Sequence, residues 1–245
     1  MNKNILKGII VLIFVLLVVI GIIFILGNNK GNDTKKPTED MLTFKEEYEA
    51  LNGKDNGAGE KYPSISIPEY NLIKYSSVEE IIELAEGGTG IIYFGFPSCP
   101  WCRNAVPELI TVTLDKGVDI IHYLDLTDLR SIWEIQEGIA VEIKQGKKEY
   151  YDLLRVFASI INPYVLTDDD GTEYETGELR IYVPLMVFVK DGEIIGYHNT
   201  TVKLPEEQSP WDSLTPSQKE ELKDLFRDLI DEMLDKAYCE ETCLD

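Results

Sequence analysis

The chain has 245 residues, of which 23 are Lys or Arg and 44 are Asp or Glu, giving a formal net charge of −21 at pH 7. A chain with this negative charge repels the phosphate backbone of nucleic acids. We therefore exclude nucleic-acid binding. Hydrophobic residues make up 44% of the sequence, which is enough for one domain with its own core.

The first distinct segment is residues 8–27, which contains no polar side chain. About 20 apolar residues in a helix span the hydrocarbon core of a bilayer. We therefore expect an N-terminal transmembrane helix after a short tail, residues 1–7. The alternative is a cleaved signal peptide, but its apolar region is shorter, about 7–15 residues, and residues 25–29 lack a small-x-small cleavage site.

The flanking lysines do not decide the orientation of this anchor. We adopt the ordinary arrangement, a single-pass protein of the cell membrane with its domain on the extracytoplasmic side. Residues 28–40 are rich in Asn, Gly, Lys, Asp and Pro and are typical of a flexible linker. The remaining residues, 41–245, form the predicted globular domain.

The first elements of this domain are two short helices. Thr43, with Glu46 three residues later, predicts a capping box at the start of a helix that carries Phe44 and Tyr48 on one face. Ser76 or Ser77 begins a second helix over residues 78–85. A run of β-branched and aromatic residues, 90–96, then predicts a strand that is buried on both faces.

The helix that follows this strand contains the sequence Cys99-Pro100-Trp101-Cys102 at its start. Residues 118–126 predict the next strand. The stretch 127–179 is expected to be a helical insertion, with its clearest helix at residues 150–161.

The last elements are a strand at residues 180–189, a tight turn at Asp191-Gly192 into a paired strand, and a long helix. Asp-Gly between two apolar runs is typical of a hairpin. Thr215, followed by Pro216 and Gln218, marks the start of the final helix. Strands alternating with helices predict an α/β domain with a mixed central sheet flanked by helices.

The four cysteines form two close pairs, Cys99 with Cys102 and Cys239 with Cys243. Cys99 comes at the first turn of a helix, where unpaired N–H groups and the helix dipole favour an anion. The thiolate is the attacking species in disulfide exchange. We therefore expect Cys99 to be the nucleophile and Cys102 the resolving thiol. A structural disulfide and metal ligation are the alternatives.

At this point the sequence resembles the thioredoxin superfamily, over roughly residues 78–236. The resemblance rests on residues 94–102, on Pro107 and on Val183-Pro184. It implies that Pro184 is a cis-proline facing the sulfurs, and that the backbone of Val183 binds an extended substrate segment. More narrowly, the chain is similar to membrane-anchored thioredoxin-like proteins of Gram-positive bacteria that are often labelled bacteriocin transport accessory proteins.

The chain departs from this family at two positions. Typical thioredoxins have a buried acid six residues before the first cysteine, where this chain has Tyr93. The dipeptide between the cysteines is Pro-Trp, so the redox poise of thioredoxin does not carry over.

Four side chains of the cysteine helix also belong to the expected site. Trp101 is predicted to be an exposed, substrate-facing ring. Pro100 and Pro107 support the active-site helix. Arg103 either stabilises the thiolate or is a solvated helix residue.

Cys239 and Cys243 are four residues apart, which in a helix places their Cα atoms within disulfide range. We consider a local structural disulfide, a second redox pair that exchanges electrons with Cys99 and Cys102, and half of a metal site.

These features predict a thiol–disulfide oxidoreductase without cofactor or bound metal. Its partners would be protein or peptide thiols and disulfides, and a membrane or extracytoplasmic redox partner. The alternatives are a non-catalytic accessory protein for peptide export or envelope assembly, and a metal-delivery protein. The sequence does not distinguish an oxidase from a reductase or an isomerase, because these share the same cysteine arrangement.

Overall fold

The central sheet of the computed structural model, which describes residues 36–234, has five strands. In spatial order they are β1 (Ile73–Tyr75), β3 (Ile121–Asp125), β2 (Gly90–Gly95), β8 (Leu185–Lys190) and β9 (Glu193–His198). β1, β3 and β2 run parallel, whereas β8 and β9 are antiparallel to their neighbours. The predicted α/β domain with a mixed sheet is therefore confirmed.

Strand β2 lies at the centre of this sheet and is buried on both faces. Because successive side chains of a strand point to opposite faces, Ile91 and Tyr93 pack into one core cluster and Ile92 and Phe94 into the other. All four side chains are fully buried. This explains why the strand is a continuous apolar run rather than an alternating one.

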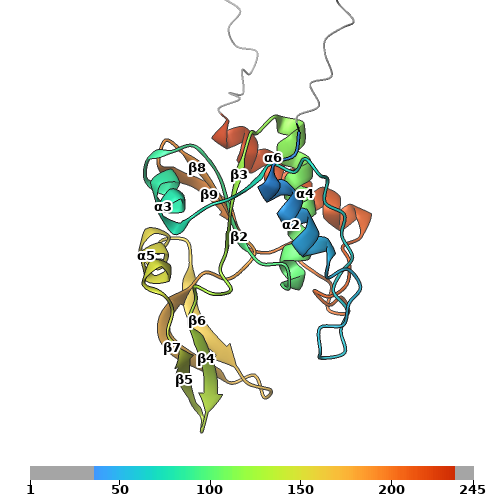
Figure 1. Ribbon diagram of the computed structural model, residues 1–245. Helices are drawn as coiled ribbons and strands as arrows, with labels where there is room; N and C mark the ends of the chain where they lie inside the picture. Colours follow the sequence, from blue (N-terminus) through green and yellow to red (C-terminus); the bar gives the residue numbers. More distant parts are fainter. Residues whose placement is uncertain (1–35, 235–245) are drawn as a thin grey trace, which may run out of the picture. The chain divides into compact units, whose positions relative to one another are not determined.

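Helices cover the two faces of the sheet (Figure 1). Helices α2 (Glu39–Glu49), α4 (Pro100–Lys116) and α6 (Pro216–Met233) contribute to the cluster that contains Tyr93. Helices α3 (Val78–Gly87) and α5 (Lys148–Val156) contribute to the cluster that contains Phe94. The sheet is thus the middle of three layers, and each face supports a separate part of the core.

Two of the three helix N-caps predicted from Ser and Thr residues are confirmed. Ser77 with Glu80 forms a capping box at α3, and Thr215 with Gln218 forms one at α6. The predicted cap at Thr43 is wrong, because the side chain of Thr38 accepts the N–H of Met41 and α2 begins at Glu39.

The early start of α2 has a tertiary consequence. It places Asp40 in the first turn, where a carboxylate is favourable at the positive end of the helix dipole. There its Oδ2 accepts a hydrogen bond from the backbone N–H of Tyr75 at 3.0 Å. This contact joins α2 to the edge strand β1, a three-residue strand that the sequence analysis did not predict.

The prediction of a helical insertion at residues 127–179 is wrong in most of its length. Only α5 is helical there, and the rest forms two hairpins that extend from the central sheet (Figure 1). Their strands are β4 (Ile132–Gln136) with β5 (Ile139–Lys144), and β6 (Asn162–Thr167) with β7 (Glu173–Arg180). Glu137 and Gly138 both have positive φ, 52° and 78°, which is the geometry of a two-residue hairpin turn.

The strand predicted at residues 180–189 is also divided. β7 ends at Arg180 and β8 begins at Leu185. Proline has no N–H to donate to a sheet, so the ladder begins only after Pro184. The hairpin turn at Asp191-Gly192 joins β8 to β9 and is confirmed.

No helix among residues 36–234 is long and apolar enough to cross a membrane. The predicted anchor at residues 8–27 lies outside the described residues.

Candidate active site

The candidate site lies where β2 ends and α4 begins. β2 ends at Gly95, and the chain turns through Pro97 before Cys99 takes the N-cap position of α4. Pro100 is the first residue of the helix, where its fixed φ suits the helix and its missing N–H costs no hydrogen bond. The sequence thus places a sulfur at the end of a helix that has unpaired backbone donors.

The sulfur of Cys99 is held by the start of α4 and by the segment before β8. Its Sγ accepts the backbone N–H of Cys102 at 3.2 Å, and its thiol donates to the carbonyl oxygen of Val183 at 3.6 Å. The pKa of Cys99 is lowered, and the largest cause is a hydrogen bond from the Cys102 thiol. The N–H groups of Cys102 and Trp101 and the charge of Arg130 lower it further, whereas burial acts in the opposite direction. Cys99 is therefore the thiol that ionises more easily.

The second cysteine has the opposite character. Cys102 is fully buried, and burial raises its pKa well above the ordinary value, as do the hydrogen bond and charge of Cys99. Two groups act in the other direction, a backbone hydrogen bond at Phe96 and the hydroxyl of Tyr93. Both cysteines are free thiols, so the pair is a dithiol with one activated member.

Two buried tyrosine hydroxyls lie behind Cys102. The hydroxyl oxygens of Tyr48, from α2, and Tyr93, from β2, are 2.7 Å apart, and both side chains are fully buried. The ring of Tyr93 extends along the sheet toward the site, because a Cβ atom built on Gly95 would lie only 2.4 Å from its hydroxyl oxygen. Glycine is therefore needed at residue 95 to leave room for this hydroxyl.

The structure locates the two prolines that the resemblance singled out. The Val183–Pro184 peptide bond is cis, as expected, and Val183 contacts the site through its carbonyl oxygen. Pro184 itself is buried. Pro107 lies inside α4, beyond the first two turns that contain the cysteines.

The expectation of a solvated Arg103 is wrong, and stabilisation of the Cys99 thiolate by Arg103 stays a prediction. The side chain is fully buried rather than solvated. Its guanidinium donates to the carbonyl oxygens of Pro63, Tyr48 and Pro97 and to the side chain of Asn52, at 2.6–3.2 Å. Arg103 therefore joins α4 to α2 and to the loop before Cys99, and a charged residue is buried because its donors are satisfied.

Two tryptophans lie at the site in different roles. Trp101 is half-buried and packs against the core cluster on the α4 face, so the expectation of an exposed ring is corrected. Trp211 lines the cleft beside Cys99 instead. Its loop is fixed by Asn104, whose side-chain amide donates to the carbonyl oxygens of Pro210 and Asp212 at 3.0 and 2.9 Å.

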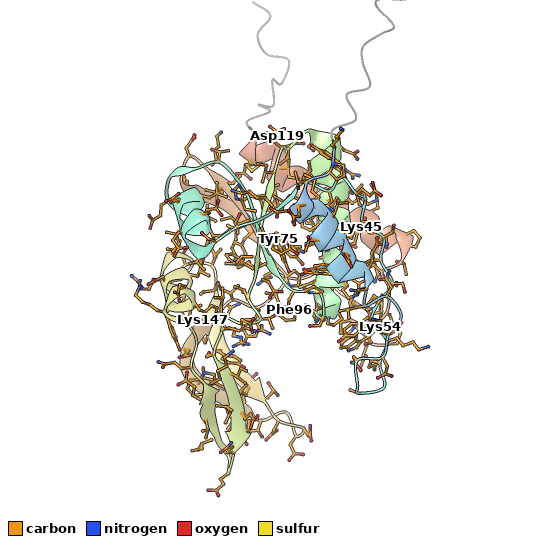
Figure 2. The ribbon with its side chains drawn as sticks, in the orientation of Figure 1. Lys45, Lys54, Tyr75, Phe96, Asp119 and Lys147 are labelled. Atoms are coloured by element: carbon orange, nitrogen blue, oxygen red, sulfur yellow. The ribbon has the colours of Figure 1, made fainter. Side chains whose placement is uncertain are left out.

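A cleft of about 390 Å³ opens beside Cys99. Its lining includes Phe96, which directly follows β2, and Arg130. The second hairpin contributes Tyr164 and Arg180. Figure 2 shows Phe96 at the end of the central sheet that faces the hairpins. The sequence analysis missed both arginines, because Arg130 lies in the insertion that it predicted to be helical and Arg180 was assigned to the strand at residues 180–189, whereas it ends β7.

No group of three or more His, Cys, Asp or Glu side chains in the described part of the chain is arranged to hold a metal ion. His122 lies on β3 and contacts the hydroxyl of Ser76 at 3.0 Å, and burial lowers its pKa. Cys239 and Cys243 lie outside the described residues, so all three interpretations of that pair stay predictions.

The chain matches no protein-family model, no curated protein and no solved structure. The fold and the site define it as an α/β protein with a Cys-x-x-Cys pair at the start of a helix. This arrangement is consistent with thiol–disulfide chemistry.

Proposed function

We propose that this protein is a thioredoxin-like thiol–disulfide oxidoreductase that acts through Cys99 and Cys102. The observation that carries the proposal is the difference in position between the two thiols. The Cys99 sulfur accepts the Cys102 N–H at the helix start and lines the cleft, whereas Cys102 is fully buried. The pKa of Cys99 is lowered at the helix start, whereas burial raises that of Cys102. A static structural disulfide needs no such difference, but a nucleophile and a resolving thiol do.

The exchange reaction follows from these roles. The Cys99 thiolate attacks one sulfur of a substrate disulfide, which forms a mixed disulfide and releases the other substrate sulfur as a thiolate. Cys102 then loses its proton and attacks the sulfur of Cys99. This step forms the Cys99–Cys102 disulfide and releases the second substrate thiolate, so two electrons pass from the protein to the substrate. The same steps in reverse oxidise a substrate dithiol, and the relative reduction potentials set the direction.

The geometry beside Cys99 supports a peptide substrate. The Val183 carbonyl oxygen lies within hydrogen-bond distance of Cys99 Sγ, so a segment that pairs with the backbone there would bring its own sulfur close to Cys99. The fold itself supports the thioredoxin-like assignment, because the central strand leads into the cysteine helix and the cis-proline precedes β8.

The cellular setting is part of the proposal. Residues 8–27 would anchor the protein in the membrane, with its domain on the extracytoplasmic side, where it exchanges disulfides with exported proteins. A non-catalytic accessory role is the weaker proposal, because a binding protein does not need a resolving thiol.

The first prediction concerns the two thiols. Pre-reduced full-length protein is mixed with a disulfide-bonded model peptide, and formation of peptide thiol is followed in a single turnover. Cys99→Ser should abolish the reaction, because serine cannot act as the sulfur nucleophile. Cys102→Ser should still attack but not resolve, so mass spectrometry should detect a covalent adduct between protein and peptide.

Ser98→Ala is the matched control, because Ser98 is an exposed neighbour of Cys99, and it should react at the wild-type rate. Exchange by the Cys99→Ser variant at that rate would contradict the proposed role of Cys99. Binding of peptide without exchange by the wild-type protein would favour the accessory role.

A further inference from the structure

The cleft beside Cys99 differs in charge from the rest of the molecule. The chain has nearly twice as many acidic as basic residues. The cleft nevertheless contains Arg130 and Arg180, and no Asp or Glu is among its lining residues. We call the part formed by these two side chains, Cys99 and the adjacent aromatic rings the arginine cleft.

The two guanidinium groups are held by aromatic rings rather than by carboxylates. Arg130 lies over the ring of Phe96 at 4.6 Å and Arg180 over that of Tyr164 at 4.1 Å. Arg180 also donates to the carbonyl oxygen of Ser131 at 2.8 Å, and its side chain is only 8% exposed. Among residues 36–234, neither arginine forms an ion pair.

The carboxylate nearest to Arg180 in sequence has other partners. Glu178 accepts hydrogen bonds from the hydroxyl groups of Ser131 and Tyr151 and from the indole of Trp133. It does not line the arginine cleft. The chain therefore brings two positive charges together and places none of its own carboxylates between them. Burial and the nearby charge of Arg180 accordingly lower the pKa of Arg130.

Arg180 is buried and Arg130 half-buried, and like charges shielded from water in this way cost free energy unless an anion compensates them. A guanidinium presents a planar fork of donors that matches a carboxylate. Because the cleft opens at Cys99, the anion must belong to a molecule that also brings a sulfur to that position. The adjacent rings of Tyr164, Tyr182 and Trp211 suit an extended peptide better than a small acid.

We propose that the arginine cleft selects peptide disulfides in which Glu or Asp lies close to the reactive cysteine, with Arg130 and Arg180 binding that carboxylate. This inference rests on the proposed function and names its substrate class. The two arginines thereby give the hairpin insertion a role in substrate recognition. They are specificity residues that form no bond to sulfur, although the charge of Arg130 also lowers the pKa of Cys99.

The test uses three disulfide-bonded peptides of equal length that carry Glu, Gln or Lys beside the attacked cysteine. Each is mixed with pre-reduced full-length protein, and the second-order rate constant of the single turnover is measured. We expect the Glu peptide to react about tenfold faster than the Gln peptide, which corresponds to one charge-assisted hydrogen-bonded contact. The Lys peptide should be the slowest.

The variant Arg130→Gln should reduce the ratio of the Glu to the Gln rate toward one. Loss of this positive charge also raises the pKa of Cys99, but that effect slows both peptides equally and cancels in the ratio. Arg155→Gln is the matched control, because Arg155 is an exposed arginine of α5 paired with Asp152, and it should keep the wild-type ratio.

Equal rates for Glu and Gln peptides in the wild type, or an unchanged ratio in Arg130→Gln, would overturn the proposal. Glutathione disulfide, a small acidic disulfide without an extended chain, is a further probe, and a rate equal to that of the Glu peptide would overturn the assignment to extended peptides.

Peptides with serine in place of both cysteines separate the two proposals. If the wild-type protein exchanges no disulfide, the proposed function fails. Calorimetry would then still support selection of acidic peptides by the cleft if the wild type binds the Glu serine peptide more tightly than the Gln serine peptide and Arg130→Gln removes this preference. The absence of such a preference would refute that selection.

Discussion

At the scale of single residues, the proposed exchange requires the buried thiol of Cys102 to become a nucleophile. Burial raises the pKa of Cys102, whereas the hydroxyl of Tyr93 lowers it. The pKa of Tyr93 is itself raised well above 10.0, first by burial and then by the nearby Cys102. Tyr93 therefore stays protonated and can act only as a hydrogen-bond donor to a Cys102 thiolate. Tyr48, 2.7 Å away, holds this hydroxyl in place.

Tyr93→Phe tests this role. A hydrogen bond to a charged group contributes about 1.5–3 kcal/mol, so resolution of the mixed disulfide should slow roughly ten- to a hundredfold. The initial attack by Cys99 should change much less. Rapid quenching with acid, followed by mass spectrometry of the mixed disulfide, separates the two steps, and its lifetime should increase in the variant. The pH at which resolution reaches half of its maximal rate should rise.

Tyr75→Phe is the control for this substitution. Tyr75 belongs to the same aromatic cluster, with its ring centroid 5.1 Å from that of Tyr123, but its hydroxyl bonds to Glu47 instead. It should leave resolution unchanged. A Tyr93→Phe variant that resolves the mixed disulfide at the wild-type rate would show that the hydroxyl does not assist Cys102.

At the scale of elements, α4 must be held firmly against the loops around it, because Cys99 is its N-cap and Cys102 lies in its first turn. Arg103 makes this connection through four buried or half-buried hydrogen bonds to α2, the loop at Pro63 and the residue Pro97. Further along α4, Glu108 is paired with Lys219 and Lys223 of α6. The position of Cys99 thus depends on contacts with segments far apart in sequence.

Arg103→Met should lower the free energy of unfolding by about 3 kcal/mol or more. It keeps the apolar stem but leaves several buried acceptors without a donor, each of which costs about 1–3 kcal/mol. Urea denaturation followed by tryptophan fluorescence measures the change.

Arg227→Met serves as the comparison, since Arg227 pairs with Glu220 and Asp224 on the surface of α6. Exposed ion pairs contribute about 0–1 kcal/mol, so this variant should remain near the wild type. If the two variants were equally stable, Arg103 would not have the structural role assigned to it.

At the scale of the whole molecule, the proposed anchor would place the domain outside the cell. Lys54 lies on an exposed loop (Figure 2) and offers a trypsin site. We expect trypsin added to intact cells to cleave the domain, with the loss of the full-length band on an immunoblot.

Lysed cells treated in the same way show whether the folded domain is cleavable at all, and a cytosolic protein reports cell integrity. A domain that survives in intact cells but is cut in lysed cells would contradict the extracytoplasmic orientation.

The sequence by itself determined the elements whose signals are local. β2 is a continuous apolar run, the caps at Ser77 and Thr215 depend on residues three apart, and the Asp191-Gly192 turn lies between two apolar stretches. The position of Cys99 at a helix start followed from the same local pattern. These predictions succeeded because each depends on residues that are neighbours in the chain.

The tertiary structure alone decided the features that depend on distant residues. Asp40 in the first turn of α2 bonds to β1, and Arg103 is buried because acceptors from three separate segments meet it. Tyr48 reaches Tyr93, and Arg130 and Arg180 come to line one cleft beside Cys99, only in the folded chain. Charge and burial around a thiol are set by whatever lies near it in space, so the chain order could locate the sulfur but not its surroundings.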